Sequence, residues 1–216
     1  MTDARPPLAI LFDLDGTLVD SLEDIAVALD LALADHGIAR PTREMVRTWI
    51  GGGARNLIAH AVEPALVEPV LARFGVHYRA APHVHSRLYA GLEPVLDQLV
   101  AAGIRLAILS NKPHDLTVPI AAALLGRWPF EIVAGQRAGV PLKPSPESAL
   151  AIASLLGVAP ADCTFVGDSA IDILTAHAAG MRAVAVTWGF RPRAELVDAS
   201  PAIIVDEPAQ LAALLR

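Results

Sequence analysis

Two aspartates, Asp13 and Asp15, directly follow the apolar run AILF at residues 9–12. Short apolar runs of this kind are typical of buried strands. An unpaired carboxylate is costly to bury, and two neighbouring carboxylates also repel each other. We therefore expect positive charge, from a metal ion, a lysine or both, beside these two side chains.

Three later stretches supply further polar and charged side chains: LSNK at residues 109–112, LKPSP at 142–146 and VGDSAID at 166–172. Together with DLDGT at 13–17 they bring acidic groups, a hydroxyl and an ammonium group. Mg²⁺ fits this chemistry, because it takes oxygen ligands and commonly uses one or two carboxylates, waters and a substrate phosphate. The four stretches therefore predict a site for Mg²⁺ and a phosphate group.

The acidic residues of these stretches predict the metal ligands. We expect the carboxylates of Asp13 and Asp168 and the backbone carbonyl of Asp15 to bind the metal. Asp172 lies one helical turn after Asp168, where it can hold a metal-bound water. Carboxylates that face a phosphate require a second cation, and Lys143 can neutralise both Asp13 and the phosphate.

The phosphate site is predicted from the residues that follow a second apolar run, IRLAIL at 104–109. The hydroxyl of Ser110 and the backbone N–H of Asn111 can donate hydrogen bonds to phosphoryl oxygens. With Lys143 they form the expected phosphate-binding set.

Alternating strand and helix patterns position these residues. Runs rich in Val and Ile predict strands at residues 9–12, 104–109, 130–135, 164–168, 183–187 and 202–206. Helical patterns lie between them, each ending in a glycine suited to a left-handed helix cap, at 93–103, 115–126, 146–157 and 170–180. This alternation predicts an α/β fold, with a Rossmann-like parallel sheet covered on both faces and ligands beyond the carboxyl ends of its strands.

The alternation breaks between about Asp20 and Gly91, where only helical patterns occur. Ser21 opens the first helix, with Asp24 three residues later as its capping partner. Further helical patterns follow at 41–50, 54–62 and 64–80. We expect a small all-helical cap domain of residues 20–87 inserted into an α/β core domain of residues 1–19 and 88–216, and loops at that edge make the cap a natural lid over the site.

The four stretches, in this order and around a helical insertion, resemble the haloacid dehalogenase superfamily of phosphatases. DLDGTLVDS together with GDSAIDI is specific as a pair, and the resemblance covers nearly the whole chain. TWIGGGARNL at 48–57 and LSNKP at 109–113 are similar to phosphoglycolate phosphatases. The resemblance implies a Mg²⁺-dependent phosphomonoesterase for a small phosphorylated metabolite, with 2-phosphoglycolate as the first guess.

The resemblance also implies a role for each matching residue. Asp13 resembles the nucleophile that forms an aspartyl-phosphate. Asp15 resembles the general acid that protonates the leaving alkoxide and then the base that activates water. Ser110 and Lys143 resemble the phosphate-binding pair. The acids of the metal site are matched by two residues, Asp168 and Asp172.

The cap carries a glycine-rich turn, Gly51, Gly52 and Gly53, followed by Arg55 and Asn56 at the next helix start. Exposed amides of glycine-rich turns readily bind anions, and a helix start can hold a substrate carboxylate. The alternative interpretations are a simple helix break for the glycines and a solvent-facing side chain for Arg55.

Composition limits the partners. The net charge of −6, the sequence pI of about 5.6 and the lack of a basic run argue against a nucleic-acid partner. The N-terminal segment does not look like a secretory signal, and no uncharged run approaches the ~20 residues that span a bilayer. We expect a cytoplasmic monomer or homodimer with no membrane partner, and Cys163 as a small core residue.

Other functions remain open at this point. Within the enzyme class they are hydrolysis of another small phosphate ester or of pyrophosphate, and a sugar-phosphate mutase. Hydrolytic dehalogenation is disfavoured because Asp15 would be superfluous. A phospho-acceptor signalling module also combines acids, a hydroxyl, a lysine and Mg²⁺, but the second aspartate and the inserted cap favour turnover.

Overall fold

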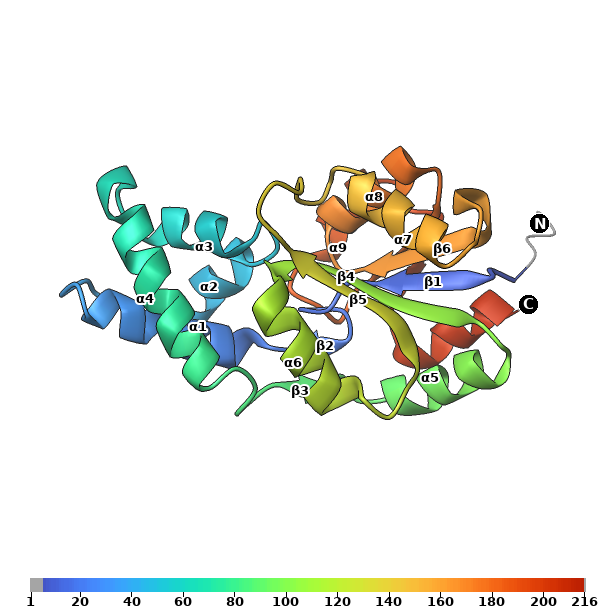
Figure 1. Cartoon of the computed structure of the whole chain (residues 1–216), viewed down its shortest axis with the longest axis horizontal. Coiled ribbons are helices and arrows are strands. Elements are labelled where there is room, and N and C mark those ends of the chain that lie inside the picture. The colour runs from blue at the N-terminus through green and yellow to red at the C-terminus, as the bar shows by residue number, and fades with distance from the viewer. Residues whose placement is uncertain (1–5, 216) are drawn as a thin grey trace.

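A parallel six-stranded sheet lies at the centre of the computed structural model, which describes residues 6–215 (Figure 1). The strand order is β5-β4-β1-β6-β7-β8, and every pairing is parallel. The bounds are β1 (Ala9–Phe12), β4 (Arg105–Pro113), β5 (Phe130–Gln136), β6 (Cys163–Gly167), β7 (Arg182–Val186) and β8 (Ile203–Val205). The α/β fold predicted from the alternating patterns is confirmed. Residues 1–5 of the N-terminal segment, which was considered as a secretory signal, lie outside the described residues.

Helices cover both faces of the sheet, because strands such as β1 present apolar side chains on both faces. The side chains of β1 alternate: Ile10 and Phe12 belong to one apolar cluster, while Ala9 and Leu11 belong to another. The first cluster includes residues of α5 (Leu92–Ala101), α6 (His114–Leu125) and the 3₁₀ helix η3 (Pro208–Leu215). The second includes residues of α7 (Glu147–Leu155), α8 (Ala170–Ala179) and α9 (Arg193–Asp198). A short 3₁₀ helix, η2 (Pro160–Asp162), precedes β6, where Cys163 is buried as expected.

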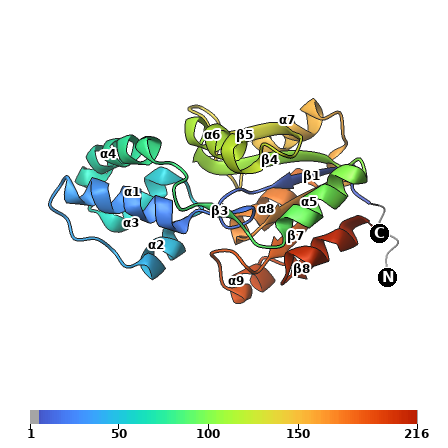
Figure 2. The same ribbon diagram turned by 90° about the horizontal axis from the view of Figure 1, so that it is seen from below.

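Four helices form a separate group at one end of the molecule (Figures 1 and 2). They are α1 (Leu22–Ala34), α2 (Arg43–Trp49), α3 (Ala54–Ala61) and α4 (Val67–Ala80), with the 3₁₀ helix η1 (Pro64–Leu66) before α4. An antiparallel ribbon of β2 (Val19–Asp20) and β3 (Arg87–Leu88) joins them to the sheet, and β3 is the one strand within the segment expected to be purely helical. The apolar faces of the helices belong to the same cluster as Phe12.

The expected capping pair at the start of α1 is wrong. Ser21 precedes the helix, but its Oγ donates a hydrogen bond to Asp15 Oδ1 at 2.5 Å and does not cap the helix. Asp24 is buried, and its carboxylate accepts hydrogen bonds from the backbone N–H groups of His85 and Ser86 and from the Ser86 hydroxyl. Both side chains therefore fasten the two linkers that join the helical group to the sheet.

The glycines expected to end four helices behave in two ways. Gly103, Gly157 and Gly180 have φ angles of 75°, 64° and 68°, in the left-handed region that favours glycine. Gly126 ends α6 at φ −61°, so its expected left-handed conformation is wrong. Within residues 6–215, no helix is both long and apolar enough to cross a membrane.

The buried carboxylate of Asp24 gives a stability prediction. Asp24→Ala leaves the Ser86 hydroxyl and two backbone N–H groups without their acceptor, and we expect a loss of ~1.5–3 kcal/mol in the free energy of unfolding. Glu23→Ala is the matched control on the same helix, because its exposed ion pair with Arg43 should contribute below ~1 kcal/mol. Urea unfolding of both variants measures the difference, and equal losses would contradict the role of Asp24.

Candidate active site

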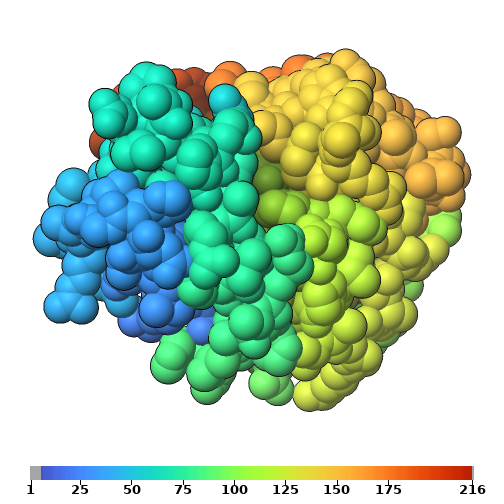
Figure 3. All heavy atoms as spheres, turned by 60° about the vertical axis from the view of Figure 1, so that its left-hand side comes forward, coloured from blue at the N-terminus to red at the C-terminus, as the bar shows by residue number. Residues whose placement is uncertain are grey.

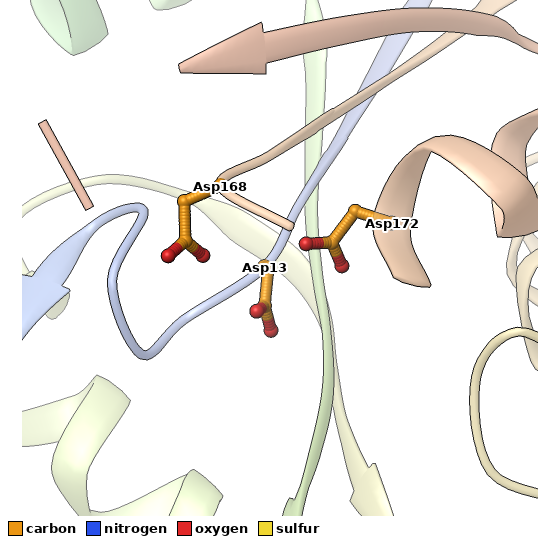
Figure 4. A group of neighbouring side chains, drawn as sticks. All are labelled: Asp13, Asp168 and Asp172. Carbon is orange, nitrogen blue, oxygen red and sulfur yellow. The ribbon is translucent and has the colours of Figure 1, made fainter. Parts of the chain in front are cut away.

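Three buried carboxylates meet at the carboxyl edge of the sheet. Asp13 follows β1 and Asp168 follows β6, its neighbour in the sheet, while Asp172 lies in the first turn of α8. One carboxylate oxygen of each lies within 4.8 Å of the others, and the side chains face one another (Figure 4). Parallel strands end at the same edge, so sequence-distant residues at strand ends necessarily converge.

Lys143 is the cation inside this cluster. Its Nζ lies 2.9 Å from Asp13 Oδ1 and 2.7 Å from Asp172 Oδ1, and its side chain is only 2% exposed. Burial disfavours the charged ammonium, but the attraction of Asp13 and Asp172 outweighs burial and raises the pKa of Lys143 above its ordinary value. Lys143 therefore stays charged.

One ammonium does not balance three buried carboxylates. Burial, together with the nearby charge of Asp172, raises the pKa of Asp13 to about 7 despite the opposing effect of Lys143. Burial and the same neighbour raise the pKa of Asp168 to about 8. The contact from Lys143 to Asp13 Oδ1 lies outside hydrogen-bond geometry, so this buried oxygen has no hydrogen-bond donor among residues 6–215. A set of carboxylate oxygens whose negative charge is only partly balanced fits a hard divalent cation.

The glycine of DLDGT is required by this cluster. Gly16 has φ +86°, which L side chains rarely adopt, and a Cβ there would collide with the carboxylate of Asp168. Thr17 Oγ1 and the backbone N–H of Phe190 donate to the two oxygens of Asp168, at 3.2 and 2.7 Å. The turn after β1 thus packs directly against the acid that follows β6.

Asp15 lies beside the cluster and has a cation of its own. Lys112, one residue after Asn111, donates from Nζ to Asp15 Oδ1 and Oδ2 at 2.9 and 3.0 Å. The same Nζ donates to the hydroxyl of Tyr78 on α4 at 2.5 Å. Sequence reasoning missed Lys112. A signal existed, because the chain has 17 lysines and arginines, and only Lys112 and Lys143 are lysines.

Ser110 and Asn111 lie beside Asp13 in one cavity, and β4 extends past them to Pro113, so they lie within the carboxyl-terminal part of the strand and do not follow it. Ser110 is buried. The Asn111 side chain is already engaged: Oδ1 accepts from the backbone N–H of Lys143 at 2.8 Å, and Nδ2 donates to the carbonyls of Lys143 and Gly51, each at 3.0 Å. Its side chain therefore positions Lys143, and the predicted phosphate contact of its backbone N–H stays a prediction.

Asp172 is also fully engaged. Its Oδ2 accepts hydrogen bonds from the backbone N–H and hydroxyl of Ser169, which form the capping box of α8. Its Oδ1 accepts from Lys143 Nζ. Asp172 thus fixes both the start of α8 and the ammonium of Lys143, and its predicted hold on a metal-bound water stays a prediction.

A small cavity of about 50 Å³ lies between helices α1, α3 and α4 and the acid cluster. Asp13, Asp15, Gly51 and Gly53 are among its lining residues. A larger groove of about 420 Å³ adjoins it, and Figure 3 shows the surface hollowed between the teal cap helices and the yellow segment before α7.

The other cap residues singled out from the sequence lie around the groove. Gly52 and Arg55 line it, and the Asn56 side chain packs closely over Gly52. Arg55 is 67% exposed and forms an ion pair with Glu68. The structure thus places Gly51 and Gly53 at the Asp13 cavity and Arg55 at its approach.

Two arginines, one on each side, join α2 to the loop after β7. Arg47 of α2 donates to the carbonyl of Gly189 in the loop after β7, at 2.5 Å. Arg191 in that loop donates to the carbonyl of Ile50 at the end of α2, also at 2.5 Å. These contacts hold the glycine-rich turn over the acid cluster. No local sequence pattern predicts them.

A family model described as haloacid dehalogenase-like hydrolase matches residues 7–180. The chain belongs to this family. The four stretches that resembled it are those whose side chains converge at the sheet edge.

Several proteins similar to this haloacid dehalogenase-like hydrolase are named phosphoglycolate phosphatases. Phosphoglycolate phosphatase 1 of Pseudomonas aeruginosa is 35% identical over 212 residues, which cover 94% of this chain and 77% of the relative. Phosphoglycolate phosphatase of Haemophilus influenzae is 35% identical over 215 residues, which cover 94% of this chain and 96% of the relative. A crystal structure from Haemophilus somnus, titled a predicted phosphoglycolate phosphatase, is 30% identical with a TM-score of 0.89, covering 98% and 99% of the two chains.

The raised pKa values of Asp13 and Asp168 predict how a cation stabilises this hydrolase. Their ordinary value is 3.8, and in the folded protein it rises to about 7 and about 8. At pH values between the ordinary pKa and these raised pKa values, the folded state holds more protons than the unfolded state. The metal-free protein therefore loses stability as the pH rises through this range. A divalent cation replaces these protons, so MgCl₂ should raise the melting temperature more at pH 8 than at pH 5.5.

Thermal unfolding with MgCl₂ or EDTA at the two pH values makes this measurement. Asp168→Asn is the control variant and should lose most of the gain. An equal gain at both pH values, or an undiminished gain in Asp168→Asn, would contradict a metal site in this cluster.

Proposed function

We propose that the protein is a Mg²⁺-dependent phosphomonoesterase that acts on a small phosphorylated metabolite, with 2-phosphoglycolate as the substrate. The observation that carries the proposal is the position of Asp13, at a strand end beside Lys143 and two further acids, with Asp15 in the same small cavity. The names of the relatives and the small cavity support the choice of substrate.

The proposed reaction uses the two aspartates in turn. An oxygen of Asp13 attacks phosphorus, and the bond from phosphorus to the ester oxygen breaks, which leaves an aspartyl-phosphate and an alkoxide. Asp15 donates a proton to the alkoxide. Asp15 then removes a proton from a water molecule, whose oxygen attacks phosphorus and releases inorganic phosphate and free Asp13.

Other residues hold the phosphoryl group during both steps. Lys143, the Ser110 hydroxyl and the backbone N–H of Asn111 are the proposed donors to its oxygens. Mg²⁺, held by Asp13, Asp168 and the backbone carbonyl of Asp15, would neutralise negative charge on the transferring group. In this proposal the backbone amides of Gly51 and Gly53, which line the cavity, contact the substrate. Gly52, Arg55 and Asn56 lie along its approach.

Residues 20–87 serve as the cap domain in this proposal, over a core domain of residues 1–19 and 88–216. The ribbon of β2 and β3 lies at this division. A cap that excludes water favours transfer to the bound substrate over side reactions. A cytoplasmic location and a monomeric or homodimeric state remain predictions from the sequence.

Substrate profiling tests the proposal directly. Phosphate release with MgCl₂ should be greatest, in kcat/KM, for 2-phosphoglycolate among small esters, and lower for pyrophosphate and for hexose phosphates that exceed the cavity. EDTA should abolish release. Full activity in EDTA, or a preference for pyrophosphate, would contradict the proposed function.

The two aspartates can be separated with two leaving groups. Asp15→Ala should slow hydrolysis of an alkyl phosphate by ~10²–10⁴-fold, because the alkoxide leaves without a proton. With p-nitrophenyl phosphate the phenolate is stable, so we expect a burst of about one equivalent of nitrophenol and then a slow steady rate. Asp13→Asn, the control, should give no burst. Equal slowing of both substrates without a burst would exclude proton transfer by Asp15.

A further inference from the structure

We propose that Lys112 binds a negatively charged group on the substrate, at the end opposite the phosphate, and so selects small phosphate esters that carry a carboxylate. The inference rests on the proposed phosphatase function and adds a specificity-determining residue to it.

The position of Lys112 is the first support. Its side chain is 3% exposed and borders the same small cavity as Asp13 and Asp15. Lys143, by comparison, lies among the acids and contacts Asp13 and Asp172. Of the two lysines, Lys143 thus lies among the acids at the proposed phosphate end, whereas Lys112 lines the small cavity, where it faces the remainder of a bound ester.

The surroundings of Lys112 are the second support. Most side chains of the cavity wall away from the acid cluster are apolar: Ile25, Ile50, Ala54, Leu57, Phe74 and Pro113. The Tyr78 ring lies 4.5 Å from Lys112 Nζ, and the Tyr78 hydroxyl accepts its hydrogen bond. An ammonium in such an apolar wall attracts an anion far more strongly than one in water. A neutral polar tail would find few partners there.

The contact with Asp15 is the third support. Lys112 Nζ donates to both oxygens of Asp15, and Ser21 donates to one of them. Asp15 must free an oxygen to reach the leaving group, so Lys112 has to give up part of this contact. A carboxylate on the substrate supplies the replacement acceptor, and the ammonium, with three donors, can hold it while keeping Tyr78.

The choice of residue agrees with this role. Apart from Lys112 and Lys143, the chain uses arginine as its long cationic side chain. Lysine is a compact point charge, which fits between Asp15 and Tyr78 and can move from one acceptor to another, whereas the planar guanidinium fork is suited to fixed bidentate pairs. Because the cavity is small, the carboxylate must lie close to the phosphate.

A matched pair of substrates tests the proposal in kinetics. 2-Phosphoglycolate and 2-hydroxyethyl phosphate are of similar size but differ in the carboxylate. Wild-type protein should prefer 2-phosphoglycolate, and Lys112→Met should lower kcat/KM for it about 10- to 100-fold more than for the neutral ester, mainly through KM. Tyr78→Phe should shift the same ratio in the same direction by less.

Equal losses with both esters would show that Lys112 only positions Asp15, and would overturn the inference while the proposed function stood. A wild-type protein without preference for the carboxylate would overturn it too. Release of phosphate from neither ester would instead refute the proposed function, and the inference with it.

The pair of lysines allows a second readout, which does not depend on the folding of Lys112→Met. Asp13→Asn protein labelled with [ε-¹³C]lysine should give two lysine NMR signals, Lys112 and Lys143. We expect 2-phosphoglycolate to shift both signals, and 2-hydroxyethyl phosphate to shift that of Lys143 alone. Signals that respond identically to the two esters would overturn the assignment of Lys112 to the carboxylate.

Discussion

The buried ammonium of Lys143, placed between Asp13 and Asp172, is the interaction on which the site depends. Without it, three buried carboxylates would share one edge of the sheet with no fixed counter-charge among them. The surrounding structure serves to keep it there: the Asn111 side chain holds the backbone of Lys143 from both its N–H and its carbonyl. Even so, one ammonium leaves negative charge uncompensated, and that deficit is the reason for the proposed cation site at this edge.

A second set of contacts links the chemistry to the cap. Asp15 accepts from Ser21 in the first linker and from Lys112, which in turn contacts Tyr78 on α4. Asp24 joins the two linkers through Ser86, so the start of α1 and the return strand are held together. The proposed acid is thus held by groups from the sheet, the linker and the cap, and the position of the cap bears directly on where Asp15 points.

The sequence predicted the sheet and its acid cluster well, because both follow from local rules. Val- and Ile-rich runs form the strands, and the residues after parallel strands must share an edge. The prediction that Ser21 and Asp24 cap the start of α1 is wrong because Asp24 has a distant partner. Its carboxylate accepts a hydrogen bond from Ser86, 62 residues away. Lys112 was missed because its partners, Asp15 and Tyr78, lie 97 and 34 residues from it. Its place in the stretch LSNK and its rarity, as one of two lysines, marked the residue, but neither indicated its partners.

The central claim is that Asp13 is the residue that becomes phosphorylated. Sodium borohydride reduces an acyl-phosphate to an alcohol, so an aspartyl-phosphate is converted to homoserine. Asp15→Ala protein should be mixed with p-nitrophenyl phosphate and MgCl₂, reduced during the burst, and digested for peptide mass spectrometry. The account predicts homoserine at position 13 and none in samples without substrate. Homoserine at position 168 or 172, or unmodified aspartate throughout, would contradict it.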